Sequence, residues 1–223
     1  MLINKYFRRG SALLLTAAVL ISIFSLIYIP ASAVEPTGVN LDGAQAIYLY
    51  NIENDKVLYE KNIYEKIQPV STVKIMAGLI SVETLGDRLD DVIVVTESMI
   101  TGVVGQHYNI MAGHTLSVRD LLYLAFCGGC HKSINILAHV ISGNPTNFIA
   151  VMNSKAKALG MNDTSYTNVT GMHSDTMYTT VDDIAKLCIA ASKNPLLMQI
   201  TTTDAYTTER LGDRNFTFEN RNY

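Results

Sequence analysis

The sequence predicts an α+β fold that begins with a β-hairpin and continues as a mostly helical body. Two short runs rich in aromatic and β-branched residues, AIYLY (46–50) and KVLYE (56–60), lie on either side of the turn-forming IENDK, which is typical of a hairpin. Longer segments after them carry apolar residues at helical spacing. The chain shows no internal repeat and no low-complexity stretch that would suggest another architecture.

The first helix is expected over residues 70–86. Val73, Met76, Ala77 and Ile80 would form one apolar stripe along it, and the closing Leu-Gly pair supplies a stop. The segment follows a proline, which is common where a helix begins.

The later elements are recognised by their boundaries. Ser117 is expected as an N-cap with Asp120 at the third helical position, and glycine, proline or threonine marks the other ends. In order, the sequence predicts helices over residues 116–126, 131–143, 144–161 and 179–195, a short strand within 89–99, and another at FTFEN (216–220).

The first 33 residues form an export signal. Lys5, Arg8 and Arg9 precede an apolar run over residues 12–29, and Ala-Ser-Ala follows as a small-residue cleavage site. We therefore expect a signal peptide (1–33), a leader (34–43) and one domain (44–223). An uncleaved membrane anchor is the other interpretation of the apolar run. Both place the domain outside the cytoplasm, either secreted, periplasmic or on the outer face of the membrane.

The charge of the chain excludes some partners. The 17 basic and 20 acidic residues give a net charge of −3, and removal of the three basic residues of the signal leaves 14 against 20, or −6. An acidic exported domain without a basic run argues against nucleic-acid binding, and membrane contact is expected only through the N-terminal segment. Three cysteines allow at most one internal pair, so a disulfide scaffold is not expected.

Ser71 and Lys74 form an S-x-x-K pattern at the start of the first expected helix. Residues three apart share a helix face, so the lysine amine can reach the serine hydroxyl. Burial disfavours the ammonium form, so such a lysine can act as a base toward a serine nucleophile. The alternative is that Ser71 only caps the helix.

A second S-x-x-K, Ser154 to Lys157, shows how weak the pattern is alone. It lies in the middle or end of a helix, where its lysines are expected on a solvated face. We expect no catalytic role for it.

A longer likeness makes the first copy specific. The chain resembles the D-alanyl-D-alanine carboxypeptidases, the low-molecular-mass penicillin-binding proteins of the β-lactamase/transpeptidase-like superfamily, over about residues 44–223. The family's P-A-S-x-x-K, its G-M-x-x-T-x-[FY]-x-N-x-x-G-[LM] and Y-S-T-x-x-D-[ML]-A run, and its [FY]-x-x-x-N-T-N stretch all have counterparts in order. The matching segments are residues 45–83, 113–126, 158–187 and 216–223.

The resemblance implies a fold and a chemistry. Ser71 would be the acylated nucleophile and Lys74 its base, in a hydrolase that trims peptidoglycan stem peptides and is trapped by penicillin and other β-lactams. No cofactor or metal is implied.

The family's second motif, S-x-N, falls on CGGCH (127–131), where the serine position is Gly129 and the asparagine position is His131. Glycine cannot relay a proton, whereas histidine can still donate a hydrogen bond to substrate. These two are the expected substrate-binding positions of a degenerate motif. Ser133-Ile134-Asn135 also spells S-x-N, but its use would require a four-residue slip of the match.

CGGCH has other interpretations when it is taken alone. It fits covalent haem attachment, a redox C-x-x-C and half of a zinc site. The flanking likeness, the absence of a thioredoxin-like plan and the lack of ligand spacing elsewhere argue against all three. A Cys127–Cys130 disulfide or two buried thiols is the preferred interpretation.

The family's third motif, K-T-G, does not occur in the 223 residues. We expect a domain that is truncated before the strand carrying that motif. The same strand would supply one backbone donor of the oxyanion hole, and one such donor is typically worth about 10²–10³ in rate, so we expect impaired peptidase activity. The rival functions are a non-catalytic domain on the same scaffold that binds cell wall or another partner, and an exported c-type haem protein.

Overall fold

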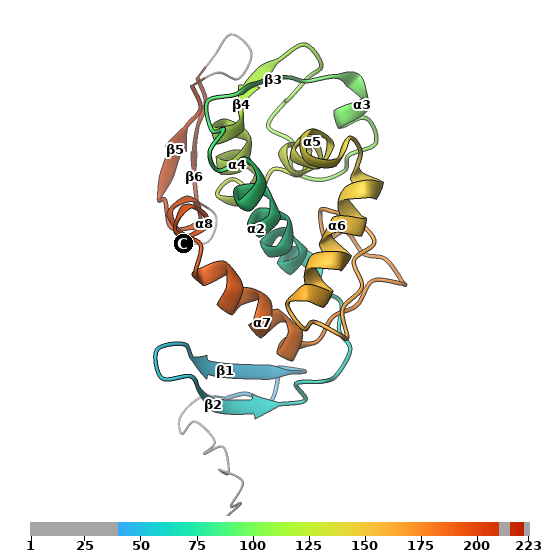
Figure 1. The fold of residues 1–223 in the computed structure, drawn as a ribbon, viewed down its shortest axis with the longest axis vertical. Helices are drawn as coiled ribbons and strands as arrows, with labels where there is room; N and C mark the ends of the chain where they lie inside the picture. The colour runs from blue at the N-terminus through green and yellow to red at the C-terminus, as the bar shows by residue number, and fades with distance from the viewer. Residues whose placement is uncertain (1–39, 210–214, 221–223) are drawn as a thin grey trace, which may run out of the picture. The chain divides into compact units, whose positions relative to one another are not determined.

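The computed structural model describes residues 40–209 and 215–220, and in this part of the chain helices surround one central helix (Figure 1). This helix, α2 (Val73–Leu85), contacts the five longer helices that follow it. Nine of its residues are buried, on more than one side, because neighbouring helices pack against several of its faces. The predicted α+β class is confirmed. The expected signal peptide, and residues 34–39 of the leader, lie outside the described residues.

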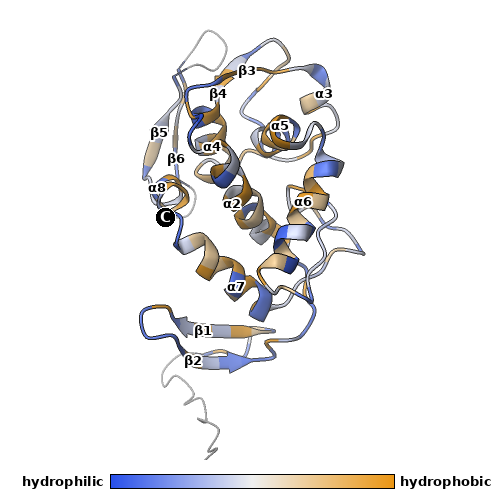
Figure 2. Ribbon diagram, viewed as in Figure 1, coloured by the Kyte–Doolittle hydropathy of each residue, from blue (hydrophilic) through white to orange (hydrophobic). Residues whose placement is uncertain are grey.

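The predicted hairpin is present. Strands β1 (Ile47–Asn51) and β2 (Lys56–Lys61) pair antiparallel, with Leu49 opposite Tyr59 and a bulge after Leu49. Strand β1 contacts the helix α7 (Val181–Ser192). The hairpin turn and much of β2 are hydrophilic, whereas hydrophobic residues concentrate on the helices α2, α4 and α5 (Figure 2).

The predicted helices all form, with caps that explain their ends. Ser117 Oγ accepts the Asp120 N–H at 3.0 Å, as expected for the helix after it. Gly143 takes the left-handed conformation (φ 78°) that ends another helix. The remaining predicted helices are α4 (Val118–Phe126), α5 (His131–Ser142) and α6 (Pro145–Ala158). Gly86, expected as a glycine stop, keeps right-handed helical geometry (φ −64°).

Short elements add to the prediction. The expected strand within 89–99 is β3 (Val92–Val94), followed by the four-residue helix α3 (Glu97–Ile100). FTFEN contains β6 (Thr217–Glu219). Besides α3, the sequence did not predict β4 (Thr115–Ser117), which pairs with β3, α8 (Pro195–Thr201), or β5 (Ala205–Thr207), which pairs with β6.

The hydrophobic core lies between α2, α4, α5 and α6, and its fully buried side chains include Met76, Leu121, Ile136 and Phe148. No helix within residues 40–209 or 215–220 has the length and apolar character needed to cross a membrane.

Candidate active site

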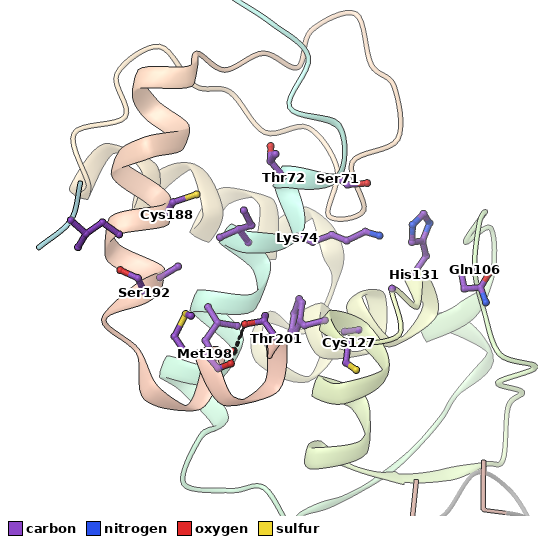
Figure 3. Close-up of a pocket in the computed structure, with 17 residues that line it drawn as sticks. Ser71, Thr72, Lys74, Gln106, Cys127, His131, Cys188, Ser192, Met198 and Thr201 are labelled. Carbon is purple, nitrogen blue, oxygen red and sulfur yellow. Dashed lines mark hydrogen bonds between the residues drawn. The ribbon is translucent and has the colours of Figure 1, made fainter. Parts of the chain in front are cut away.

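One cavity of about 750 Å³ collects the residues that the sequence singled out (Figure 3). Ser71 and Lys74 line it together with Gly129 and His131. The rest of its wall is mainly apolar, from β1–β2, α4, α7 and α8. Its other lining residues are Ile52, Thr72, Ile75, Gln106, Ala125, Phe126, Cys127, Cys188, Ala191, Ser192, Leu197, Met198 and Thr201.

Ser71 lies in a short 3₁₀ turn, η1 (Val70–Thr72), directly before α2. The helix begins at Val73 with Thr72 as its N-cap, so the alternative in which Ser71 only caps the helix is wrong. Ser71 is exposed in this turn.

The backbone beside Ser71 is held in an unusual conformation. Val70 has a φ of 46°, the left-handed region that a β-branched residue rarely adopts. Such a conformation costs about 1–3 kcal/mol and persists only where surrounding contacts impose it.

The loop between α6 and α7 supplies that contact. Gly171 (φ 82°) approaches Val70 so closely that an added Cβ atom would overlap the Val70 carbonyl. Asn168 shapes this turn: its Oδ1 accepts the Gly171 N–H at 2.8 Å, and its Nδ2 donates to the Met172 carbonyl at 2.8 Å. The N-x-x-G-M string therefore supports the turn that carries Ser71.

Lys74 lies in the first turn of α2 and is half-buried. Its amine extends along the cavity toward the side on which His131 stands, while the Ser71 hydroxyl lies above it (Figure 3). The structure thus brings the serine, the lysine and CGGCH to the same cavity.

The CGGCH loop joins α4 to α5 and forms the wall of the cavity that faces Lys74. Gly129 has a φ of 71° and faces Lys74: a Cβ atom added to it would lie 3.9 Å from Lys74 Nζ. The space that a serine Cβ would need is therefore present at this position. The left-handed backbone, however, disfavours any side chain there.

His131 is fixed by the loop between α3 and β4. Its backbone N–H donates to the Gln106 carbonyl at 2.7 Å, and its Nδ1 lies 2.8 Å from the Val104 carbonyl. Gly105 (φ 105°) lies against the imidazole so closely that a Cβ atom there would overlap the ring. Burial lowers the pKa of His131, and the positive charge of Lys74 lowers it further.

Aromatic side chains support the loop from behind. The Tyr108 hydroxyl donates to the Gly128 carbonyl at 2.8 Å, and Phe218 packs where a Gly128 side chain would stand, 3.0 Å from an added Cβ atom. Each of the two glycines in CGGCH is therefore favoured for its own reason. Gly128 leaves room for the ring of Phe218, and Gly129 adopts a left-handed conformation.

Cys127 and Cys130 are buried free thiols, in line with one of the two preferred interpretations. Burial raises the pKa of both thiols, so neither is a ready thiolate. Their exposed fractions are 1% and 0%, which disfavours covalent haem attachment. Within residues 40–209 and 215–220, no three His, Cys, Asp or Glu side chains gather as a metal-binding group.

The alternative motifs lie away from the cavity. Ser133 and Asn135 are buried on the core side of α5, and Asn135 Nδ2 donates to the Met99 carbonyl at 2.8 Å. Neither lines the cavity, so the slipped S-x-N is wrong. Ser154 and Lys157 are exposed on α6, as expected for an S-x-x-K without a catalytic role.

Sequence reasoning missed Gln106 and the α7–α8 wall of the cavity, which includes Cys188, Ser192 and Thr201. Gln106 follows Gly105 in a loop without periodicity, so only the glycine hints at a close approach. The α7–α8 residues read as ordinary helix positions.

The α+β fold that holds this serine, this lysine and the loop between α4 and α5 is the fold of the penicillin-binding, transpeptidase-like proteins. Solved structures agree. The D-alanyl-D-alanine carboxypeptidase DacD from Francisella tularensis has a TM-score of 0.71 at 27% identity, covering 78% of this chain and 43% of that one. The D-alanyl-D-alanine carboxypeptidase from Mycobacterium tuberculosis H37Rv has a TM-score of 0.73 at 23% identity, covering 79% and 66%.

The chain belongs to the D-alanyl-D-alanine carboxypeptidase family, Peptidase S11, which matches residues 32–223. It is 29% identical over 217 residues to the D-alanyl-D-alanine carboxypeptidase DacF of Bacillus subtilis, covering 93% of this chain and 55% of that protein. It is 30% identical over 156 residues to a D-alanyl-D-alanine endopeptidase of Escherichia coli, covering 70% and 49%. The chain thus spans about half the length of these relatives.

Proposed function

We propose that this chain is a serine-type D-Ala-D-Ala carboxypeptidase-like protein of peptidoglycan metabolism that forms an acyl-enzyme on Ser71. The observation that carries the proposal is the shared cavity of Ser71, Lys74, Gly129 and His131. The family match supports a D-Ala-D-Ala peptide, as in the peptidoglycan stem peptide, as the substrate class, and the resemblance implies β-lactams as the inhibitor class.

The proposed chemistry follows from the position of each group. Ser71 Oγ attacks the carbonyl carbon of the D-Ala-D-Ala peptide bond while Lys74 accepts the hydroxyl proton. The positive end of the α2 dipole lies beside the developing oxyanion and favours it. Water then releases the acyl group from Ser71.

Turnover is expected to be slow. Gly129 offers no hydroxyl where the resemblance expects a serine, and general acid–base catalysis is typically worth about 10²–10⁴-fold. We therefore expect acylation to be easier to detect than peptide hydrolysis, in an extracytoplasmic protein exported by residues 1–33.

Labelling with a fluorescent penicillin tests the proposal. The wild-type chain should carry a covalent label, Ser71→Ala should lose it, and Ser154→Ala, in the exposed second S-x-x-K, should keep it. A peptide map must place the label on Ser71. Labelling that persists in Ser71→Ala would overturn the assignment.

The left-handed glycine at position 129 favours a second candidate, a non-catalytic domain that binds stem peptide on the same scaffold. This candidate predicts saturable binding of a D-Ala-D-Ala peptide by calorimetry without covalent labelling of Ser71. Covalent labelling with release of D-alanine would remove it.

A further inference from the structure

We propose that His131 is a catalytic acid–base group, which carries the Ser71 hydroxyl proton from Lys74 to the departing nitrogen. The inference rests on the proposed acylation of Ser71 and adds a residue to it. The imidazole would perform the proton relay that a serine at position 129 would otherwise perform.

The hydrogen bond at Nδ1 fixes which ring nitrogen can react. A carbonyl oxygen can only accept, so the contact of 2.8 Å with Val104 requires that Nδ1 carries a proton. In the neutral imidazole the other nitrogen, Nε2, then has the lone pair and acts as the acceptor. The same carbonyl would stabilise the imidazolium that forms when Nε2 takes a proton.

The surroundings place this imidazole beside the amine. His131 and Lys74 line the same cavity, and the Lys74 amine extends toward His131 (Figure 3). Gly129 contributes no side chain to the space around that amine. Gly105 closes the other side of the ring, so the imidazole has little freedom to turn away.

The electrostatics keep the ring neutral, so that Nε2 holds the lone pair with which it can accept a proton. Burial lowers the pKa of His131 most, the Val104 hydrogen bond opposes this, and the charge of Lys74 adds a smaller lowering. Lys74 is the charged group that acts on it from α2. The packed loop presents the Val104 carbonyl, Gly105 and Gln106, none of which titrates, and Lys132 on its own helix donates instead to the Ile110 carbonyl at 2.6 Å.

The proton balance is closed. A bond forms between Ser71 Oγ and the carbonyl carbon as the carbon–nitrogen bond breaks. The hydroxyl proton moves to the Lys74 amine, then to His131 Nε2, and from Nε2 to the departing nitrogen. No oxidant, reductant or metal is required. The step starts from the fraction of chains in which Lys74 has released its resting proton to solvent, and the amine regains a proton from Ser71 before passing it to Nε2.

The test compares pH profiles of penicillin acylation from about pH 5 to about pH 9. In the wild type the rate should fall on the acid side with a pKa below the usual histidine value. In His131→Gln, which cannot take a proton, this limb should vanish and the neutral-pH rate should fall about 10²-fold. His139→Gln, on the same helix but outside the cavity, should keep both features.

A second readout does not depend on acylation. The His131 imidazole is followed by NMR in the wild type and in Lys74→Met, where loss of the positive charge should raise its pKa. An unchanged pKa, or a neutral ring protonated at Nε2, would overturn the proposal. Acylation that is unaltered in His131→Gln would overturn it while the proposed function stands. A wild-type chain that is never acylated would overturn both.

Discussion

The two walls of the cavity differ in how they relate sequence to chemistry. The wall of Ser71 and Lys74 keeps the side chains that the family resemblance expects, on a backbone strained at Val70 and held by Gly171. The CGGCH wall lies where the resemblance places the second motif, but it carries a left-handed glycine at 129 and an imidazole at 131 where the resemblance expects a serine and an asparagine. The comparison teaches that a family likeness can predict both the position and the side chains of one wall but only the position of the other.

The largest expected effect concerns the Ser71 wall. Lys74→Met keeps the length of the side chain but removes its amine, so penicillin acylation should fall by about 10²–10⁴-fold if Lys74 is the base. Rapid-quench labelling measures the rate. Lys157→Met, in the exposed S-x-x-K of α6, is the matched control and should be unchanged. Equal rates for the two variants would show that the first wall holds no base.

Most of the helices could be predicted from the sequence, because local residues determine where a long amphipathic helix with strong caps begins and ends. The α5 helix is an example, since Gly143 and the apolar spacing fix its extent. The α8 helix was missed because Asn194-Pro195 was read as the end of α7. In the structure, Asn194 Oδ1 accepts the Leu197 N–H at 3.0 Å and caps the next helix. The same dipeptide therefore follows the end of α7 and begins α8, and the burial of Leu197 stabilises the second helix.

The candidate site was likewise predicted only in part. The S-x-x-K spacing and the family likeness placed Ser71, Lys74 and CGGCH together, but they could not reveal that Ser71 lies in a 3₁₀ turn. That turn depends on Gly171, about a hundred residues away, and local propensity carries no information on such a contact. Gln106 escaped notice for the same reason.

The support beneath Ser71 is the next target. In Gly171→Ala the new methyl would overlap the Val70 carbonyl on a left-handed backbone, so we expect a loss of about 3 kcal/mol in the free energy of unfolding. Gly160→Ala is the matched control, because Gly160 has a similar φ of 74° but open space around it. It should lose only about 1 kcal/mol. Urea unfolding measures both, and equal losses would deny the close contact.

Restoring a hydroxyl to the CGGCH wall gives a smaller effect in the opposite direction. A serine at 129 has room near Lys74, so Gly129→Ser should raise D-alanine release from a D-Ala-D-Ala peptide about tenfold. It should also cost about 1–2 kcal/mol of stability, because φ is 71°. Gly129→Ala shares the strain without the hydroxyl and should gain no activity. If the two variants match in rate, the hydroxyl is not what this wall lacks.

The smallest effect tests what holds the CGGCH wall in place. Tyr108→Phe removes the hydrogen bond to the Gly128 carbonyl but keeps the ring, which packs edge-to-face on Phe216 at 5.3 Å between centroids. The loss should be about 1 kcal/mol in unfolding free energy, since the carbonyl is left without this donor. Tyr64→Phe, at a ring that is 71% exposed, should change stability by less than about 0.5 kcal/mol. Because the aromatic packing remains, penicillin acylation in Tyr108→Phe should stay within about threefold of wild type. If acylation fell by more than about threefold, the Tyr108 hydroxyl would position the reacting groups. The CGGCH wall would then do more than hold His131 in place.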